Sequence, residues 1–367
     1  MKYKLEELCE FITDGTHQTP KYCEEGGVMF LSSKDVTARK IDWDNVKHIP
    51  ESLHEKLYAR LSPRKDDILL AKNGTTGVAA LVDRDEIFDV YVSLAVLRPK
   101  DIVYPKYLLY AINSPVVKKQ FDAGLKGVGV PNLHLSVIRK TEINIEKYGK
   151  QLEVCGILDK VASIIDARKE ELQKLDELIK ARFVELFGDV KTGVYKFKTR
   201  KLGEVAIVGS SHRVFTTEFV ENGVPFYRGT EIGELANGIK PENPYRITKE
   251  HYDRLASDET KPQIGDLLMP SICNKGQVWM VDTDEPFYYK DGRVLCISPN
   301  RKLFNCKYLE QFMREKTLVE YPKLGSGSTF AEFKIFLLKD IDVLIPPIEL
   351  QNQFAAFVKQ IDKSKVA

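Results

Sequence analysis

Two stretches of this sequence carry polar side chains at the tip of an otherwise apolar segment. Residues 67–83 read DILLAKNGTTGVAALVD, and residues 266–282 read DLLMPSICNKGQVWMVD. Each begins with an acid and an apolar triplet, breaks at a polar turn that contains Asn, and resumes with apolar residues up to an Asp. An Asn-Gly pair between apolar runs predicts a β-hairpin. Lys, Asn and Thr at such tips donate and accept hydrogen bonds, so the chemistry that they offer is that of binding.

Motifs for catalysis are absent from the sequence. It contains no glycine-rich phosphate loop, no Gly-x-Ser-x-Gly nucleophile elbow and no His-Glu-x-x-His zinc motif. The six histidines are dispersed, and the six cysteines form no Cys-x-x-Cys pair. Such cysteines fit free thiols in a reducing cytoplasm better than a disulfide framework or a zinc site. We therefore expect a chain that binds and positions, without a metal or a catalytic residue of its own.

Length and composition set further bounds. A chain of 367 residues is too long for one typical core, which predicts two or three domains. The formal net charge is only +2, so any nucleic-acid site must be a local patch or be completed by a partner. No stretch approaches the roughly 18 apolar residues of a membrane span, and the first residues lack a secretory pattern. A cytoplasmic location is expected.

The elements that must position the two tips form an internal repeat. Residues 28–36 (VMFLSSKDV) match residues 224–232 (VPFYRGTEI), and residues 106–108 match residues 307–309. The offset between matching positions stays between 196 (28 to 224) and 201 (106 to 307). Further matches join Pro99 with Pro299, and Gly127-Val128-Gly129 with Gly325-Ser326-Gly327. Within each copy, short apolar strands alternate with helical stretches, which predicts a mixed α/β (α+β) fold.

A different pattern separates the two copies. Residues 150–187 contain no Pro and a single Gly, and apolar residues recur at spacings of four and three, as in a heptad seam. This predicts a long helix that ends before Gly188. The seam consists of Val154, Leu158, Val161, Ile165, Leu172, Leu175, Ile179 and Leu186, with Arg168 and Arg182 between them. The two arginines either pack their stems while their charges reach water or an acidic neighbour, or they fix the helix register or meet a partner protein.

A shorter helix with the same pattern follows the second copy. Its seam consists of Phe354, Phe357, Val358 and Ile361. Since an amphipathic helix needs a partner, we expect the two helices to pack antiparallel, which would relate the two copies by an approximate two-fold axis. The predicted boundaries are 1–149 for the first α/β domain, 150–188 for the long helix, 189–346 for the second α/β domain and 347–367 for the short helix.

With this order of unit, long helix, unit and short helix, the chain resembles the DNA-specificity subunit of type I restriction–modification systems. The resemblance rests on the two hairpins, the repeated strand and glycine motifs, residues 181–189 (ARFVELFGD) and the helix entry Pro346-Pro347…Gln351. It implies two target-recognition domains that each read one half of a split DNA sequence. It also implies helices that act as a spacer and dock modification (methyltransferase) subunits, which restriction (translocase and endonuclease) subunits join. S-adenosylmethionine, ATP and Mg would then be bound by the partner subunits.

The resemblance directs attention to polar residues on loops as DNA contacts, because base edges are read by donors and acceptors and phosphates attract Lys and Arg. Lys72 and Lys275 are the predicted phosphate contacts, and Asn73, Asn274 and Arg228 the predicted base contacts. The full set of candidates is Ser33, Lys34, Lys72, Asn73, Thr75, Thr76, Asn132, His134, Tyr227, Arg228, Thr230, Asn274, Lys275, Ser326 and Ser328.

The long helix sets a scale for the target. The seam from Val154 to Leu186 is about 50 Å long at about 1.5 Å per residue, or about 15 base pairs at about 3.4 Å each. This predicts two short half-sites with a fixed, non-specific spacer. The second helix is shorter than the first, a departure that would weaken the docking of partners. Two other functions stay open: a DNA-modifying enzyme with unrecognised motifs, and a coiled-coil interaction scaffold without a DNA role.

Overall fold

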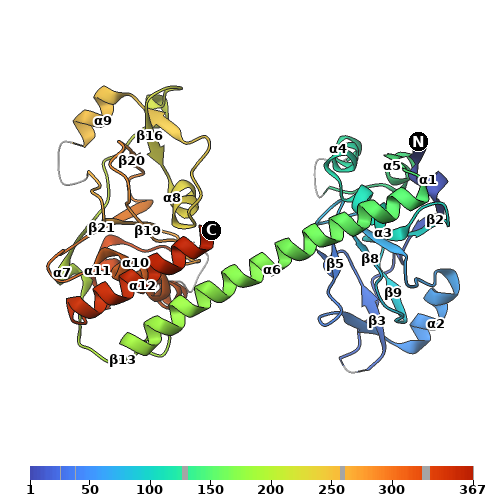
Figure 1. Cartoon of the computed structure of the whole chain (residues 1–367), viewed down its shortest axis with the longest axis horizontal. Helices are drawn as coiled ribbons and strands as arrows, with labels where there is room; N and C mark the ends of the chain where they lie inside the picture. Colours follow the sequence, from blue (N-terminus) through green and yellow to red (C-terminus); the bar gives the residue numbers. More distant parts are fainter. Residues whose placement is uncertain (25, 38, 126–130, 257–260, 325–330, 367) are drawn as a thin grey trace. The chain divides into compact units, whose positions relative to one another are not determined.

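The computed structural model describes residues 1–24, 26–37, 39–125, 131–256, 261–324 and 331–366 (Figure 1). The chain divides into two compact units, Met1–Ala167 and Arg168–Ala367, and the division falls inside the long helix α6 (Tyr148–Phe187). Each unit mixes helices with small sheets, so the predicted fold class is confirmed. Among the helices of the described ranges, none is long and apolar enough to cross a bilayer.

The first unit contains two main sheets. A four-stranded antiparallel sheet has the order β2 (Cys9–Asp14), β10 (Leu94–Pro99), β7 (Ile68–Ala71), β8 (Ala79–Leu81). A three-stranded sheet has the order β6 (Lys47–Ile49), β3 (Val28–Leu31), β9 (Phe88–Val90), in which β3 and β9 run parallel. Two ribbons pair β1 (Lys2–Lys4) with β11 (Glu142–Asn144), and β4 (Val36–Thr37) with β5 (Lys40–Ile41).

Among the described residues, five short helices complete this unit, together with the first part of α6. They are α1 (Leu5–Leu8), α2 (Glu51–Arg60), α3 (Pro105–Ile112), α4 (Pro115–Gly124) and α5 (Leu135–Lys140). Helices α3 and α4 begin with Pro at their first position, where the missing N–H has no intrahelical partner to lose.

The two main sheets of the second unit repeat the strand order of the first. Its four-stranded sheet has the order β15 (Ala206–Gly209), β21 (Val294–Pro299), β18 (Leu267–Pro270), β19 (Trp279–Met280). Its three-stranded sheet has the order β17 (Tyr245–Ile247), β16 (Val224–Tyr227), β20 (Tyr288–Tyr289), again with one parallel pair, β16 and β20. The ribbons pair β14 (Thr199–Lys201) with β22 (Asp342–Leu344), and β12 (Gly188–Asp189) with β13 (Val194–Tyr195). The expected duplication of one α/β unit is thus visible in the strand order.

The helices of the second unit are α7 (Leu202–Val205), α8 (Gly229–Ala236), α9 (Lys249–Leu255), α10 (Cys306–Glu320), α11 (Ile335–Lys339) and α12 (Ile348–Val366). They differ from those of the first unit at two places, since α8 has no counterpart in the described part of that unit and the single helix α10 replaces α3 and α4. Two 3₁₀ turns, Thr216–Glu218 and Tyr321–Leu324, stand beside them.

The apolar triplets of the two hairpins are buried on both faces of their sheets. Ile68 and Leu70 belong to one hydrophobic core of the first unit, whereas Leu69 packs into another. A strand covered on both sides reads as a continuous apolar run, which explains ILLA at this place. In the second unit, Leu267 and Leu268 divide between two cores in the same way.

The acids and glycines shared by the hairpins maintain the fold. Asp67 is buried and accepts from Arg98 Nη2 at 2.8 Å, and Asp266 is buried and accepts from Arg301 Nη2 at 2.7 Å. Gly276 has a φ of 67°, and a Cβ there would lie 2.9 Å from a backbone oxygen of α10. Only glycine suits such a turn.

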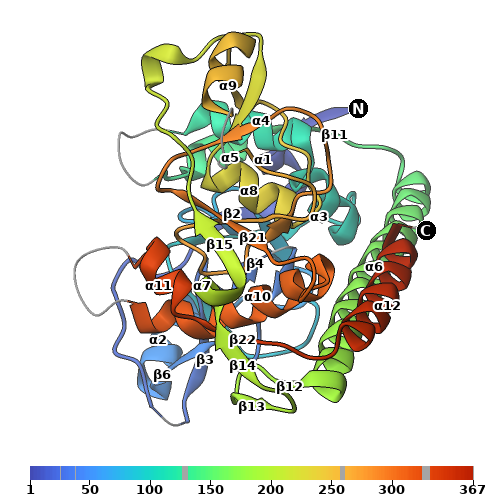
Figure 2. The same ribbon diagram turned by 90° about the vertical axis from the view of Figure 1, so that its left-hand side faces the viewer.

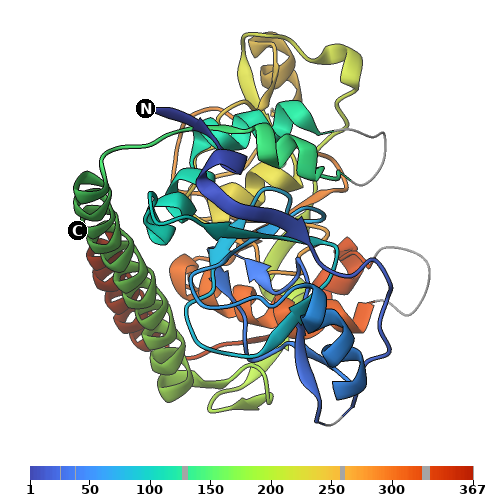
Figure 3. The same ribbon diagram turned by 90° about the vertical axis from the view of Figure 1, so that its right-hand side faces the viewer.

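Helix α12 packs against the part of α6 that belongs to the second unit, and the two helices lie side by side (Figure 2, Figure 3). Phe354 near the start of α12 meets Phe183 near the end of α6, with ring centroids 5.4 Å apart. At the other end, Arg168 Nη2 donates to the carbonyl oxygens of Ser364 and Lys365, at 3.2 and 3.0 Å. The expected antiparallel packing is therefore confirmed for this part of α6.

The predicted seam is covered only in this second part. Ile179, Phe354, Val358 and Ile361 are buried in the core of the second unit, and Leu172, Leu175, Leu186 and Phe357 are half-buried. In the first part of α6, Val154 is half-buried, whereas Leu158, Val161 and Ile165 are 36%, 47% and 48% exposed. A seam that is uniform in sequence therefore has two different environments.

The seam also shifts by one residue near the end of α6. The heptad pattern places Arg182 in the seam, but Arg182 is half-buried and pairs with Glu185 at 2.7 Å, while Phe183 is buried. The shift follows from the 3.6 residues per turn of an α-helix, which drift away from a 3.5-residue repeat. Arg168 pairs with Glu171 at 2.6 Å, so both arginines reach an acidic neighbour, and Arg168 in addition contacts the end of α12.

Candidate nucleic-acid interface

Lys72 and Ser271 directly follow β7 and β18, the first strands of the two hairpins. The backbone of each residue connects the end of its strand to two other segments of the unit. In the second unit, the N–H of Ser271 donates to the carbonyl oxygen of Arg293 at 2.9 Å, and its carbonyl oxygen accepts from the N–H of Phe333 at 2.7 Å. These two bonds hold Arg293 and the neighbouring Glu332 beside the end of β18. We call this arrangement the junction.

The first unit contains the same junction. The N–H of Lys72 donates to the carbonyl oxygen of Ser93 at 2.8 Å, and its carbonyl oxygen accepts from the N–H of Leu133 at 2.9 Å. The equivalent positions are therefore Lys72 and Ser271, Ser93 and Arg293, and Asn132 and Glu332. The backbone frame is shared between the units, and the side chains that it presents are different.

A fourth segment follows β3 or β16 and approaches each junction. In the first unit, the N–H of Ser33 donates to Ser93 Oγ at 3.0 Å. In the second unit, a Cβ on Gly229 would lie 3.1 Å from Cβ of Pro270, the last residue of β18. Each unit thus gathers the end of a strand, the base of a hairpin and two further loops, held by a rigid scaffold, which is a common setting for a binding site.

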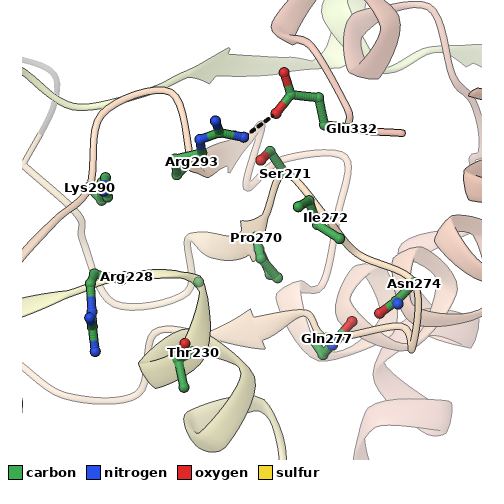
Figure 4. Close-up of a pocket in the computed structure, with 11 residues that line it drawn as sticks. Arg228, Thr230, Pro270, Ser271, Ile272, Asn274, Gln277, Lys290, Arg293 and Glu332 are labelled. Atoms are coloured by element: carbon green, nitrogen blue, oxygen red, sulfur yellow. Dashed lines mark hydrogen bonds and ion pairs between the residues drawn. The ribbon is translucent and has the colours of Figure 1, made fainter. Parts of the chain in front are cut away.

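At the junction of the second unit these segments line an open cavity of about 730 Å³ (Figure 4). Figure 4 shows Arg293 and Glu332 paired on one side, with Thr230, Gln277 and Asn274 on elements across from them. The lining residues are Arg228, Gly229, Thr230, Pro270, Ser271, Ile272, Asn274, Gln277, Lys290, Arg293 and Glu332. Three cations and several amide or hydroxyl groups suit a polyanion that carries hydrogen-bonding groups.

Arg228 is held in place from two sides. Its Nη2 donates to Glu231 Oε1 at 2.6 Å, and its guanidinium carbon lies 4.5 Å from the ring centroid of Tyr245. Burial raises the pKa of Glu231, but hydrogen bonds from Arg228 outweigh that effect and leave the pKa of the carboxyl below its usual value. The carboxylate is therefore charged at neutral pH, and the guanidinium plane is fixed before any ligand binds.

Arg293 is paired as well, but it is more open to solvent. Its Nη1 donates to Glu332 Oε2 at 2.6 Å, and the two side chains are 57% and 20% exposed. A hydrogen bond from Lys334 is the main cause that lowers the pKa of Glu332, with the charge of Arg293 acting in the same direction. Both members of the pair are charged at neutral pH.

The structure speaks against the phosphate contact predicted for Lys72. Lys72 and Asp14 are 6% and 8% exposed, and Lys72 Nζ donates to Asp14 Oδ2. A buried ammonium that is already paired cannot reach a phosphate without breaking that pair. Lys275, the other predicted phosphate contact, is exposed on the second hairpin.

The remaining candidates of the first unit lie around its junction or on the loops beside it. Asn73 and Asn132 face each other in an isolated antiparallel bridge. Among the described residues, buried Oδ1 of Asn132 has no hydrogen-bond partner. Lys34, Thr75 and His134 are exposed, whereas Ser33 and Thr76 are half-buried.

In the second unit, Thr230 and Asn274 line the cavity and are exposed, whereas Tyr227 serves packing. The ring of Tyr227 stacks on that of Phe287 with centroids 5.2 Å apart, and burial raises the pKa of its hydroxyl. Ser326 and Ser328 lie outside the described residues, as do Gly127, Gly129 and Gly325.

Sequence reasoning missed Ser93, Lys290, Arg293 and Glu332. Pro99 and Pro299 match at an offset of 200, and counting back six positions from each would have aligned Ser93 with Arg293. The same offset aligns Asn132 with Glu332. The repeat offset therefore relates these positions in the sequence, but they lie outside the hairpins. Only the backbone hydrogen bonds of the junction show that they are close to one another in the folded unit.

Two features bear on catalysis in the described part of the chain. No set of three or more His, Cys, Asp or Glu side chains there could hold a metal ion. Burial raises the pKa of Cys9 and Cys296 to about 12 and that of Cys273 to about 11. These three thiols stay protonated at neutral pH and are poor nucleophiles.

Comparison with known proteins shows which family shares this architecture. The family model described as "Type I restriction modification DNA specificity domain" matches residues 1–177 and 195–367. A curated type I restriction enzyme MjaX specificity subunit from Methanocaldococcus jannaschii is 25% identical over 294 residues, 74% of this chain and 64% of that protein. The chain thus spans less than two thirds of this relative. The crystal structure of the type I restriction–modification S subunit from M. genitalium has the same fold, with a TM-score of 0.54, 16% identity and coverage of 100% of this chain and 90% of that one.

Proposed function

This chain belongs to the type I restriction–modification DNA specificity family, and we propose that each of its two units reads one half of a bipartite DNA target. The observation that carries the proposal is the duplicated junction with different side chains in its two copies. Two copies of one frame bind the same polymer in the same general way. Their different donors and acceptors then select different bases, because base edges carry the sequence information.

The modest net charge of +2 is compatible with this role. Three positive groups of the second unit, Arg228, Lys290 and Arg293, line one cavity at the junction. A local cation such as Lys290 can neutralise a phosphate near the site without making the whole protein basic. Modification subunits bound beside this chain would supply further phosphate contacts.

We propose that α6 sets the separation of the two half-sites. Its 40 residues form one uninterrupted helix, about 60 Å long at about 1.5 Å per residue. The exposed apolar residues of its first part, Leu158, Val161 and Ile165, suit contact with a modification subunit, because apolar rows on a helix mark protein interfaces.

The chemistry in this proposal belongs to the partners. The chain acts as a non-catalytic subunit, modification subunits bind S-adenosylmethionine, and restriction subunits bind ATP and Mg. The absence of nucleotide and nucleophile motifs from the sequence supports this division. A cytoplasmic location follows from the same proposal, since the DNA target lies there.

Co-expression with a modification subunit, followed by methylation mapping of genomic DNA, tests the proposal. We expect methylation at a bipartite motif with a gap of constant length. A continuous motif, or none in the presence of an assembled complex, would refute it. Methylation or cleavage of DNA by the purified chain alone would instead indicate an enzyme.

The spacer role has its own variant. Deletion of residues 160–166 removes one heptad of α6 between the contact of Asp159 with Lys106 and that of Arg168 with α12. The gap should shorten by about 10 Å, or about three base pairs, while both half-sites stay the same. An unchanged gap would refute the spacer role. The control keeps the length of α6 and replaces Val161 and Ile165 by Ala, which separates a loss of docking from a change of spacing.

A further inference from the structure

The junction of the second unit carries a charged pair where the first unit carries neutral side chains. Arg293 and Glu332 occupy the positions of Ser93 and Asn132, and in both units the same two backbone hydrogen bonds fix these positions. Arg293 and Glu332 are held through backbone atoms of the loops that bear them, so their location does not depend on their side chains. This position can therefore vary in chemistry without a change in the fold.

The pairing decides which part of DNA such an arginine suits. Glu332 pairs with both Arg293 and Lys334, and its carboxylate, which lies beside the Arg293 guanidinium, would be repelled by a phosphate. The guanidinium has five N–H donors, and one of them is directed to Glu332 Oε2, which leaves donors for neutral acceptors. Two adjacent N–H groups of an arginine match O6 and N7 of guanine in the major groove.

The side chains of Arg293 and Glu332 are exposed enough to contact a ligand. Arg293 is 57% exposed and lines the cavity of about 730 Å³ together with Ser271 and Asn274 (Figure 4). Glu332, which is 20% exposed, supports the guanidinium from one side. Arg228 lines the same cavity but shares three hydrogen bonds between its side chain and Glu231, so fewer of its donors are available.

From this geometry we infer that Arg293 is a specificity-determining residue that reads a guanine in the half-site of the second unit, and that Glu332 is the residue that positions it. The inference rests on the proposed function and deepens it. The equivalent residues of the first unit, Ser93 and Asn132, lack a cation, so that junction selects a base without an arginine.

The test uses the complex with modification subunits and methylation mapping, with substitutions to the residues that the first unit has at the same positions. In Arg293→Ser, one guanine position of the second half-site should relax, with a loss of discrimination of about 5- to 150-fold, while the first half-site and the gap stay the same. Glu332→Asn should relax the same position to a smaller extent. Because both side chains are partly exposed and the junction is made by backbone atoms, both variants should fold.

Arg293→Lys provides a second variant in case Arg293→Ser abolishes methylation. It keeps the charge but loses the planar fork, so it should methylate DNA and still relax the guanine position. Arg200→Ser is the matched control, since Arg200 pairs with Glu204 at 3.1 Å outside this cavity, and its motif should equal that of the wild type.

The outcomes separate this inference from the proposed function. If the wild-type complex yields no bipartite motif, the proposed function fails and the inference falls with it. If the wild type yields a bipartite motif and Arg293→Lys keeps full discrimination at every position, the inference is overturned while the proposed function stands. A change in the first half-site or in the gap, with the second half-site intact, would overturn it as well.

Discussion

Gln351, at the start of α12, is fully buried and makes three hydrogen bonds that tie this helix to the body of the second unit. Its Oε1 accepts from the N–H of Asn305 at 2.9 Å, and its Nε2 donates to the carbonyl oxygens of Leu303 and Pro346, at 2.9 and 2.8 Å. Replacing Gln351 by Leu keeps the approximate size of the side chain and removes all three bonds. The variant therefore tests how much a buried amide stabilises the docking of α12.

The magnitude follows from the groups that lose their partner. A buried donor or acceptor without a partner costs about 1–3 kcal/mol, and the substitution leaves one N–H and two carbonyl oxygens in that state. Removing a buried amide and adding an apolar side chain offsets part of this cost. We expect a net loss of about 3 kcal/mol in the free energy of unfolding, which lowers the melting temperature of a unit of this size by about 6–12 °C.

Thermal unfolding of the full chain, followed by circular dichroism, measures this shift. Hydrogen exchange of the amides in α12 and at the start of α10 then localises it to the second unit. Gln353→Leu is the matched control, because Gln353 lies two residues away on the same helix and is exposed. A melting temperature for Gln351→Leu within 1 °C of that control would refute the reasoning.

The first unit offers an independent repetition of this experiment. Gln151 is fully buried, its Oε1 accepts from the N–H of Tyr104 at 2.7 Å, and its Nε2 donates to the carbonyl oxygens of Ile102 and Glu146. Gln151→Leu should therefore increase hydrogen exchange in the first unit by a similar amount and leave α12 protected.

Three further predictions concern charges and thiols. Lys72→Met leaves the carboxylate of Asp14 buried without its partner and should lower the stability of the first unit by about 3–5 kcal/mol in a denaturant titration. Lys275→Ala should leave the melting temperature unchanged and reduce the salt dependence of DNA binding by the complex by about one ion, as measured by binding isotherms at several salt concentrations. Burial raises the pKa of Cys296 to about 12, so iodoacetamide at pH 8 should modify half-buried Cys23 and leave Cys296 intact in the native protein. Since the folded-state pKa of Cys296 is raised, its contribution to stability is present below about pH 8.5 and is lost as the pH rises from there toward 12.

Much of the fold could be predicted because the signals for it are local and occur twice. The apolar triplets after Asp67 and Asp266, the Asn-containing turns and the helical spacing of residues 150–187 depend on neighbours within a few positions. Strand and helix periodicity are properties of such short windows, so the hairpins, the mixed α/β units and the two antiparallel helices follow from them.

The candidate site was harder to predict because its parts are distant in the chain. Ser271 meets Arg293 across 22 positions and Phe333 across 62, and no periodicity links these residues. Hydrogen bonds between loops bring them together, and these depend on the strand order of the whole unit. The hairpin turn contributes Asn274 and Gln277 to the cavity, but Arg228, Lys290, Arg293 and Glu332 come from other segments of the unit.

The sequence by itself determined the duplication, the main strands and helices of each unit and the family to which the chain belongs. Each of these follows from short motifs and periodicities that recur in the same order along the chain. Tertiary structure decided which polar residues can reach a ligand. Lys72 and Lys275 lie on equivalent hairpins. Lys72 is buried and paired with Asp14 of β2, whereas Lys275 is exposed to solvent. Burial and pairing depend on residues contributed by distant segments, and the same residue type can therefore maintain the fold in one unit and remain free to bind in the other.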